Sequence, residues 1–242
     1  MSTRIDRVIV TGASSGIGFD LAQRFLAEGS RVVVNGRDPA KLERARRALG
    51  EEKRVVAVAG AIGDPATGRA LAEAARSHFG GVDVLVNNAG IFAPKPFLET
   101  TEADLDAFYA TNVRGTYLTT QAVVPLMIAC GGGSIVNVGT VLVGQAMTGL
   151  PVSAAMSSKG GVHALTVSLA AELARHHIRV NTLAPGIVRT PLIDDADALA
   201  GIHPLGRIGE VRDTSDAVLF LATAGFVTGV TLEVDGGYAH GR

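Results

Sequence analysis

Short runs of β-branched and other apolar residues recur along the chain, and each run ends at a turn-forming residue. Seven such runs are present, at residues 8–10, 32–34, 55–58, 82–86, 135–138, 178–183 and 230–234. Short apolar runs closed by Gly, Asn or Pro are typical of parallel strands that are covered on both faces. The pattern therefore predicts a parallel sheet of seven strands.

The segments between these runs show apolar residues at helical spacing. Helices are predicted at 19–27, which Gly29 ends, and at 39–49, where Asp38 caps and Pro39 opens the first turn. Thr100 or Thr101 is placed to cap a long helical segment over 102–129. A fourth helix carries one apolar stripe, formed by Val162, Leu165, Leu169 and Leu173. This alternation predicts one three-layer, doubly wound α/β domain of the Rossmann type over residues 1–242.

Composition and charge exclude several classes of protein. The 22 Lys and Arg residues nearly balance the 23 Asp and Glu residues, which argues against nucleic acid as the main partner. A hydrophobic fraction of 47% with only 19% charged residues favours self-association of the chain. The single cysteine, Cys130, excludes an intrachain disulfide and a multi-cysteine metal site.

Location is predicted from the absence of targeting and membrane signals. Residues 1–7 are polar, and the longest apolar run, 122–130, has nine residues including Pro125, too few to span a bilayer. We therefore expect a cytoplasmic protein with no membrane partner.

Glycine is the most unusual feature of the composition, with 30 of 242 residues, about 12% against a typical ~7%. Three of these glycines lie in the loop 11–18, between the first strand and the first helix. Gly12 permits a tight turn, Gly16 permits close approach to a pyrophosphate, and Gly18 permits the helix to pack against the strand. A glycine-rich turn without a ligand is the simpler alternative, but the position after the first strand favours a dinucleotide.

The Gly-x-x-x-Gly-x-Gly spacing of this loop resembles that of the short-chain dehydrogenase/reductase family, in its short single-domain branch. Further segments agree with the resemblance over nearly the whole chain: 87–90 (NNAG), Asn112, Lys159, 179–186 (RVNTLAPG), 187–190, 206–210 and 234–237 (VDGG). The resemblance implies an oxidoreductase with a nicotinamide cofactor. The cofactor contacts that it implies are Gly12, Ser14, Ser15, Gly16, Ile17, Gly18, Asn35, Arg37, Ile62, Asn88, Ala89, Gly90, Lys159, Pro185, Gly186, Val188 and Thr190.

The end of the second strand separates NAD(H) from NADP(H). A carboxylate there binds the ribose 2′-hydroxyl, whereas an arginine accepts a 2′-phosphate. The sequence has Arg37 at this point, and Asp38 is better explained as the helix cap. We therefore expect NADP(H), although Arg37 as an ordinary solvated charge remains open. Ala61 stands where the family often has an acidic residue that contacts adenine.

The resemblance also implies a Tyr-x-x-x-Lys pair on the helix after the fifth strand, in which lysine lowers the pKa of the tyrosine that exchanges a proton with substrate. Lys159 is present, but Ala155 occupies the tyrosine position. Asn112 is the implied support of the lysine. Thr140 is the candidate hydroxyl that orients the substrate carbonyl, and it lies 15 residues before Ala155, slightly farther than is usual.

Four explanations of Ala155 remain open. The first is an engineered Tyr→Ala substitution, and the second is a natural variant with another proton donor, for which the candidates are Ser153, Ser157, Ser158 and a water held by Lys159. The third is an iminium substrate, which needs no strong acid. The fourth is a protein that binds the cofactor without catalysis. We therefore expect hydride transfer on a small carbonyl, alcohol or imine, with the ordinary carbonyl reaction impaired. The alternative is regulatory or structural binding of NADP(H) without catalysis.

Other polar clusters favour structural explanations. His163, one turn after Lys159, is better explained by packing than by catalysis, and His176 and His177 suit a helix C-terminus. Asp194, Asp195 and Asp197 are typical of a solvated segment, and no spacing suggests a metal. The resemblance places a substrate lid at 190–204, and it implies a homotetramer, with a homodimer as the alternative.

Overall fold

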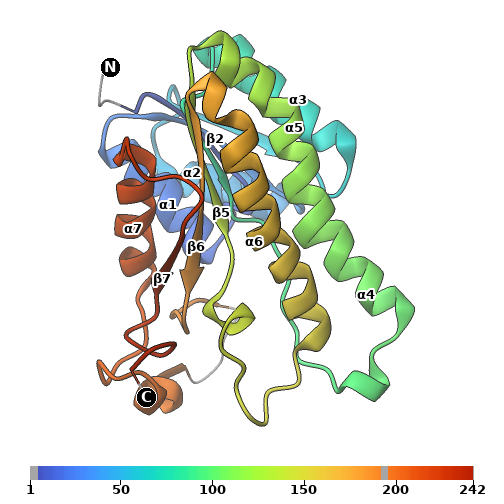
Figure 1. Cartoon of the computed structure of the whole chain (residues 1–242). Helices are drawn as coiled ribbons and strands as arrows, with labels where there is room; N and C mark the ends of the chain where they lie inside the picture. Colours follow the sequence, from blue (N-terminus) through green and yellow to red (C-terminus); the bar gives the residue numbers. More distant parts are fainter. Residues whose placement is uncertain (1–4, 192–195, 242) are drawn as a thin grey trace.

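The strands form one fully parallel sheet in the order β3-β2-β1-β4-β5-β6-β7, which confirms the predicted doubly wound α/β fold. The computed structural model describes residues 5–191 and 196–241 (Figure 1). The strands are β1 (Arg7–Val10), β2 (Arg31–Gly36), β3 (Val55–Ala59), β4 (Val84–Asn87), β5 (Gly133–Val138), β6 (Ile178–Pro185) and β7 (Thr231–Val234). The direction of winding reverses between β1 and β4. In such sheets the crevice at the carboxyl ends of the reversing strands is where ligands bind.

Helices cover both faces of the sheet, giving the three layers seen in Figure 1. One face carries α1 (Gly16–Ala27), α2 (Pro39–Leu49) and α7 (Val211–Thr223), and the other carries α3 (Pro65–Phe79), α5 (Gly115–Ala129) and α6 (Ser153–Leu173). Each face has its own apolar core, centred on residues such as Leu21 and Val34 on the first and Leu71 and Val180 on the second. Burial on both faces explains why the strands are continuously apolar.

The predicted helix boundaries hold in part. Asp38 caps α2 by accepting hydrogen bonds from the backbone N–H groups of Ala40 and Lys41, at 2.8 and 3.0 Å. Gly29 follows the end of α1 with a φ of 89°, which suits glycine. The apolar stripe predicted on the fourth helix lies on α6, where Val162 and Leu173 are buried.

The long helix expected over 102–129 is interrupted. It consists of α4 (Glu102–Phe108), capped by Thr101, a π-helical segment η2 (Tyr109–Arg114), and α5. The wider turn of a π-helix inserts one extra residue, and such turns are frequent at functional sites. Here the turn contains Asn112, which is buried.

Short 3-10 segments complete the described structure: η1 (Phe97–Glu99), η3 (Val141–Val143), η4 (Ala174–His176) and η5 (Ala196–Ile202). Within residues 5–191 and 196–241, no helix is long and apolar enough to cross a membrane.

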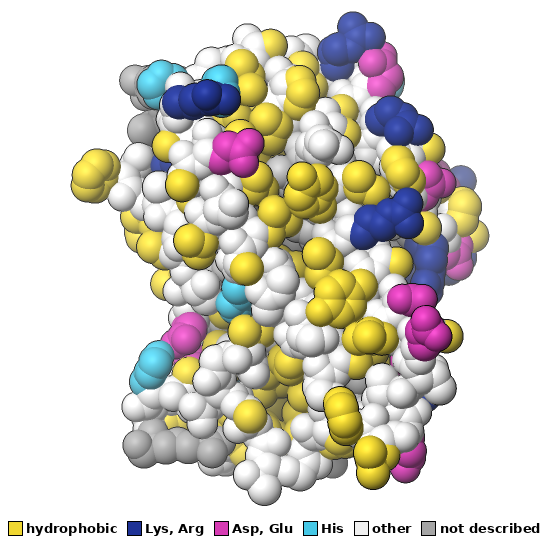
Figure 2. All heavy atoms as spheres, turned by 45° about the vertical axis from the view of Figure 1, so that its right-hand side comes forward, with side chains coloured by type: hydrophobic (Ala, Val, Ile, Leu, Met, Phe, Trp, Pro, Cys, Tyr) yellow, Lys and Arg dark blue, Asp and Glu magenta, His cyan; other side chains and the backbone are white. Residues whose placement is uncertain are grey.

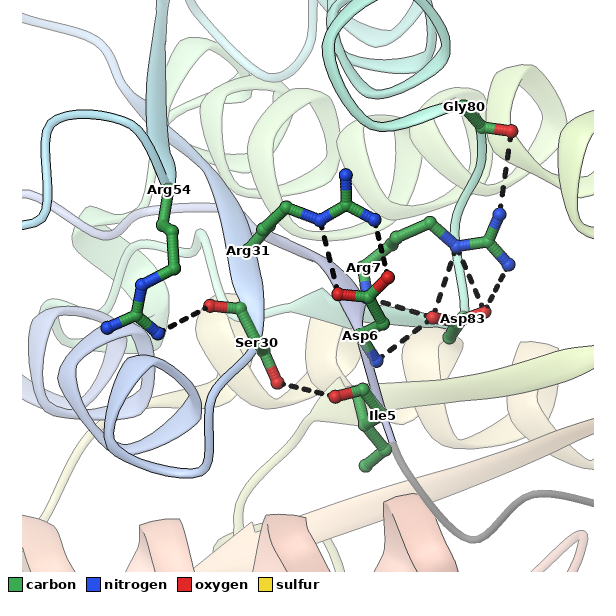
Figure 3. A network of polar contacts seen from close by, with 8 residues as sticks. All are labelled: Ile5, Asp6, Arg7, Ser30, Arg31, Arg54, Gly80 and Asp83. Carbon is green, nitrogen blue, oxygen red and sulfur yellow. Dashed lines mark hydrogen bonds and ion pairs between the residues drawn. The ribbon is translucent and has the colours of Figure 1, made fainter.

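An ion-pair network holds the amino-terminal edge of the sheet (Figure 3). The Asp83 carboxylate, just before β4, accepts hydrogen bonds from the backbone N–H of Asp6 and Arg7 and from the Arg7 guanidinium, at 3.1, 2.8 and 2.5 Å. Arg31, at the start of β2, pairs with Asp6. Because strand starts meet at this edge, the network lies at the opposite end of the sheet from the crevice.

Candidate active site

The glycine loop folds tightly against the end of β4. Gly12 has a φ of 65°, and a Cβ placed on it would lie 2.8 Å from Ala89 Cα, so only glycine fits there without strain. A Cβ on Gly18 would lie 2.4 Å from Asn88 Nδ2. Gly16 also has a positive φ, of 57°. The loop is therefore shaped by its three glycines, as the sequence predicts.

Hydrogen bonds from Asn88 fix the loop to the sheet. The side-chain amide of Asn88 donates to the carbonyls of Thr11 and Gly12, at 2.9 and 3.1 Å. Thr11 Oγ1 also accepts hydrogen bonds from the backbone N–H groups of Asn88 and Ala89, both at 3.0 Å. Sequence reasoning did not assign Thr11 a role, although its position as the first polar residue after β1 is a signal that points to it.

The N-terminus of α1 differs from those of α2 and α3. Asp38 and Asp64 cap α2 and α3 with their carboxylates, whereas Ser15 makes no side-chain cap and the first turn of α1 contains no acidic residue. The first N–H groups of a helix lack partners within the helix and attract an anion. The loop and this helix end therefore fit the pyrophosphate of a dinucleotide, which Ser14, Ser15, Gly16, Ile17 and Gly18 would hold.

The residues predicted for the adenosine half fall into two groups. Arg37 is exposed directly after β2, and a Cβ on the preceding Gly36 would lie 3.3 Å from Ser14 Oγ, so this strand end adjoins the glycine loop. Asn35 is buried, and its side-chain amide donates to the carbonyls of Val58 and Gly60, at 3.0 and 3.1 Å. Ile62 is also buried. Asn35 is therefore bonded to β3 and the turn after it, and Ile62 belongs to the apolar core of the second face.

Lys159 and Asn112 converge beside Gly90. A Cβ placed on Gly90 would lie 3.0 Å from Lys159 Nζ and 3.1 Å from Asn112 Oδ1. The Lys159 ammonium donates a hydrogen bond of 2.7 Å to the carbonyl of Val138, at the end of β5. Burial lowers the pKa of Lys159 to about 8, because the charged amine loses solvation. Lys159 therefore lies beside Gly90 at the carboxyl end of β5, with the pKa of its ammonium below the ordinary value.

The side chain of Asn112 is fully used in holding this corner together. Its amide donates to the Ile91 carbonyl at 3.1 Å and to Ser158 Oγ at 2.8 Å, and its oxygen accepts from the Ile91 N–H at 2.8 Å. The π-turn thus locks onto the loop after β4 and onto α6. The Ser158 contact was not predicted, because nothing in the spacing joins residues 112 and 158.

Ala155 lies one turn before Lys159 on α6 and is only 1% exposed. It belongs to an apolar cluster with Phe108 and Ala154, against which Phe92 and Met156 pack. A cavity of about 220 Å³ lies beside this cluster, and residues that line it include Ile91, Phe108, Val152 and Ala154. The position at which the resemblance implies tyrosine therefore presents a methyl group in apolar surroundings.

The remaining predicted residues line the crevice from β5, β6 and the segment after β6. Thr140 follows β5, and its hydroxyl accepts from the Leu142 N–H at 3.3 Å. Pro185 ends β6, and Val188 is buried and bridges to Gly209. A Cβ on Gly16 would lie 3.4 Å from Thr190 Cγ2, so Thr190 adjoins the glycine loop.

Gly186 lies against a residue that the sequence did not indicate. A Cβ on Gly186 would meet the Asp235 backbone at 2.9 Å and His203 Nε2 at 3.3 Å. His203 is buried and accepts from the Ile187 N–H at 3.4 Å. It therefore helps to position the backbone next to Gly186.

The other histidine of interest, His163, packs beneath the site. A Cβ on Gly139 would lie 2.2 Å from His163 Nε2, which has no hydrogen-bond partner among the described residues. Burial, and then the nearby Lys159 ammonium, lower the pKa of His163. Across the described ranges, no group of three or more His, Cys, Asp or Glu side chains is arranged to hold a metal. Asp194 and Asp195 lie outside these ranges.

Comparison with known proteins identifies the family to which this site belongs. The family model described as short chain dehydrogenase matches residues 6–199. The chain belongs to the short-chain dehydrogenase family. Galactitol 2-dehydrogenase (L-tagatose-forming) of Cereibacter sphaeroides is 39% identical, over 95% of this chain and 93% of that protein. (3R)-3-hydroxyacyl-CoA dehydrogenase of Rattus norvegicus is 35% identical, over 95% and 94%.

A solved structure gives the same assignment. The 3-ketoacyl-(acyl-carrier-protein) reductase of Brucella melitensis, complexed with NADH, superposes with a TM-score of 0.92 at 36% identity, covering 98% of this chain and all of that one. This short-chain dehydrogenase is therefore an oxidoreductase by family, and the similar Brucella reductase was solved in complex with NADH.

Proposed function

We propose that this short-chain dehydrogenase transfers hydride between NADP(H) and a small carbonyl or imine, with the corresponding alcohol or amine as the reverse substrate, and that its acid catalysis is weakened. The observation that carries the proposal is Ala155, a buried methyl group one turn before a well-placed Lys159. The bound cofactor supplies or accepts the hydride. The chain positions the cofactor and substrate and manages the proton.

The choice of NADP(H) over NAD(H) rests on Arg37. This arginine is exposed at the end of β2, next to the glycine loop, and no carboxylate follows the strand before the Asp38 cap. A guanidinium forms paired hydrogen bonds with a phosphate, which NAD(H) lacks at the ribose. Titration of the protein with NADPH and NADH, followed by cofactor fluorescence, tests this, and equal affinities would count against it.

The proposal that acid catalysis is weakened is tested by placing a tyrosine at position 155. Ala155→Tyr returns a hydroxyl to the site, and Ala155→Phe is the matched control with the same ring and no proton to give. Losing a general acid typically costs about 10²–10⁴-fold in rate. On a panel of carbonyls we expect Ala155→Tyr to raise kcat by a substantial part of that factor and Ala155→Phe to leave it low. No gain for Ala155→Tyr on any carbonyl, with fold and cofactor binding retained, overturns the lost-acid explanation.

An imine substrate is the case in which a missing acid matters least. An iminium ion already carries the positive charge that a carbonyl gains only through proton donation. A panel that pairs each ketone with the imine formed from it therefore separates the two substrate classes. A marked preference of the unmodified protein for imines favours the iminium explanation of Ala155.

A protein that binds NADP(H) without catalysis, in a regulatory or structural role, is the second candidate. The apolar surroundings of Ala155 favour it, because Phe108 and Ala154 supply no proton donor there. The panels above discriminate between the two, since NADPH binding without oxidation of NADPH by any carbonyl or imine supports this candidate alone.

The wider organisation follows the family expectation. We propose a single domain over residues 1–242, with 190–204 as a substrate cover. Of this cover, residues 192–195, including Leu192 and Ile193, lie outside the described residues, and the described part contains η5 with Leu199 and Ile202. We also propose a cytoplasmic location, in keeping with the single unpaired Cys130.

We propose that the chain assembles as a homotetramer, with a homodimer as the alternative. Apolar side chains are exposed on the two long helices, Tyr117 and Ile128 on α5 and Val167 on α6. Figure 2 shows the face that includes these helices, with hydrophobic and uncharged side chains across its centre and most charged side chains toward its edges. An exposed apolar patch of this kind is typical of an interface. Light scattering of the unmodified protein and of Val167→Glu measures the assembly.

A further inference from the structure

Two serine hydroxyls close to Ala155 in the chain are bonded to backbone carbonyls of α6. Ser157 Oγ donates to the Ala154 carbonyl at 2.8 Å, and Ser158 Oγ donates to the Ala155 carbonyl at 2.7 Å. Both bonds run back along α6. Ser153, the first residue of α6, is exposed. Ser157 and Ser158 are therefore engaged along the helix, and Ser153 offers only an aliphatic hydroxyl, which is a very weak acid.

Thr140 does not supply an acid either. Its hydroxyl caps η3 by accepting from Leu142, which leaves it able to orient a substrate oxygen by donating one hydrogen bond. A neutral aliphatic hydroxyl is a very weak acid, so giving up its proton in the reaction is costly. Thr140 is therefore suited to orientation and not to net proton transfer.

Lys159 is the cationic donor that remains at this corner. An ammonium group has three N–H donors, and the single hydrogen bond described here, to the Val138 carbonyl at 2.7 Å, uses one. Its Nζ lies beside Gly90, which has no side chain to cover it. Because position 155 contributes only a methyl group, no aromatic ring stands between this ammonium and the substrate side of the crevice.

We propose that Lys159 is the general acid of this chain and donates an Nζ proton directly to the substrate heteroatom. The inference rests on the proposed function. As hydride reaches the carbon of a carbonyl or of a neutral imine, the electron pair of the C=O or C=N bond moves to the heteroatom. A bond forms between that atom and the proton as the Nζ–H bond breaks, and Lys159 becomes a neutral amine. Solvent returns the proton after each turnover, and the reverse reaction uses the neutral amine as base.

The electrostatic surroundings of Lys159 are simple enough to give a clear pH dependence. The neighbours on β5, on η2 and on the loop after β4 are Val138, Asn112 and Gly90, none of which titrates. On α6 the titratable neighbour is His163, whose pKa is lowered, so it is neutral where Lys159 titrates. With the pKa of Lys159 at about 8, the acid form is lost as the pH rises through that value.

The kinetic test is the pH profile of carbonyl reduction with saturating NADPH. We expect kcat of the unmodified protein to fall about tenfold per pH unit above the break near pH 8. Lys159→Arg keeps the positive charge but does not release its proton in this range. This variant should show no break between pH 7 and 10 and a kcat lower by about 10²–10⁴-fold. NADPH affinity, measured by fluorescence, shows how far a binding defect contributes to that loss.

The second readout needs neither cofactor nor turnover. The chain has four lysines, Lys41, Lys53, Lys95 and Lys159, so reductive methylation with ¹³C-formaldehyde yields few NMR signals, and Lys159→Arg assigns one of them. We expect the Lys159 signal to titrate near pH 8.

The outcomes separate this inference from the function on which it rests. A pH-independent kcat, or wild-type kcat in Lys159→Arg, overturns Lys159 as the acid while hydride transfer stands. Titration of Lys159 near pH 10 overturns it as well. Absence of NADPH binding and of any turnover defeats the proposed function itself, and the inference with it.

Discussion

Asn88 donates two hydrogen bonds to Thr11, from its side-chain amide to the Thr11 carbonyl at 2.9 Å and from its backbone N–H to Thr11 Oγ1 at 3.0 Å. These bonds tie the end of β1 to the end of β4, the two strands between which the sheet reverses its winding. The glycine loop is thus held in one shape before any ligand arrives. Such preorganisation lowers the cost of ordering a loop upon binding.

Loss of this tie should weaken cofactor binding more than it weakens the fold. Asn88→Ala removes the side-chain bonds to Thr11 and Gly12, each with a net value of about 1 kcal/mol. We expect the Kd for NADPH to rise roughly tenfold, since 1.4 kcal/mol corresponds to a factor of ten. Thr11→Ser, which keeps the hydroxyl, is the control and should bind nearly as well as the unmodified protein. Unchanged affinity in Asn88→Ala would contradict the role given to this tie.

Reversal of the charge at the end of β2 should change the preferred cofactor. In Arg37→Asp a carboxylate replaces the guanidinium, so a 2′-phosphate meets repulsion while a ribose 2′-hydroxyl gains an acceptor. Hydrogen bonds to charged groups contribute about 1.5–3 kcal/mol, so NADPH affinity should fall about 10–100-fold with NADH affinity unchanged or higher. The same change of charge at Arg69, exposed on α3, is the control. A parallel loss for both cofactors would show that Arg37 does not read the phosphate.

The sheet could be predicted from the sequence because a strand that is buried on both faces has a simple sequence pattern. This pattern is a short apolar run with a turn residue after it. The capping of α2 by Asp38 was equally readable, since it depends on neighbours in the chain. The π-turn at Tyr109–Arg114 was not, because a few residues of wider winding barely alter an apolar spacing. Contacts such as Asn112 with Ser158 join distant segments and depend on the packing of whole helices.

The same reasoning explains which features of the site's geometry could be expected from the sequence. Gly12 and Gly18 carry their geometric reason in the chain, because each avoids a clash with the segment after β4. Asn35 was expected at the cofactor, but its side-chain amide donates to β3 and the turn after it, since a strand end beside an edge strand offers carbonyls to a buried donor. His203 gave no signal, because its partner Ile187 becomes a neighbour only in the folded chain.

The Asp83 network should support stability without affecting the site. Asp83→Ala leaves the Arg7 guanidinium, which is only 21% exposed, without its carboxylate (Figure 3). Removing one partner of a partly buried ion pair, together with two backbone hydrogen bonds, should lower the free energy of unfolding by about 2–4 kcal/mol. NADPH affinity of the folded protein should not change, because this edge is opposite the crevice. Glu73→Ala, which breaks an exposed pair with Arg76, is the control and should cost well under 1 kcal/mol. If both variants lower the free energy of unfolding equally, the partly buried Asp83 network is no more stabilising than an exposed ion pair.

The buried charge of Lys159 should lower the free energy of unfolding at neutral pH. Its pKa is about 8 in the folded chain against 10.5 as the ordinary value, so the unfolded chain binds more protons between these pH values. Because of this group, the free energy of unfolding rises with pH across that window. The rise is about 1.4 kcal/mol per pH unit and about 3 kcal/mol in all.

Lys159→Met keeps the length of the side chain and removes the charge. At pH 7 this variant should be more stable than the unmodified protein by up to about 3 kcal/mol, reduced by about 1 kcal/mol for the lost bond to Val138. Urea unfolding at several pH values measures the difference, which should shrink from pH 8 toward pH 10.5. If the stability difference between the two proteins does not change with pH, or if the variant is less stable at pH 7, the buried charge of Lys159 does not destabilise the fold. The burial that lowers the stability of the fold also lowers the pKa of the Lys159 ammonium. A lower pKa makes its proton easier to transfer, as the proposed role of proton donor requires.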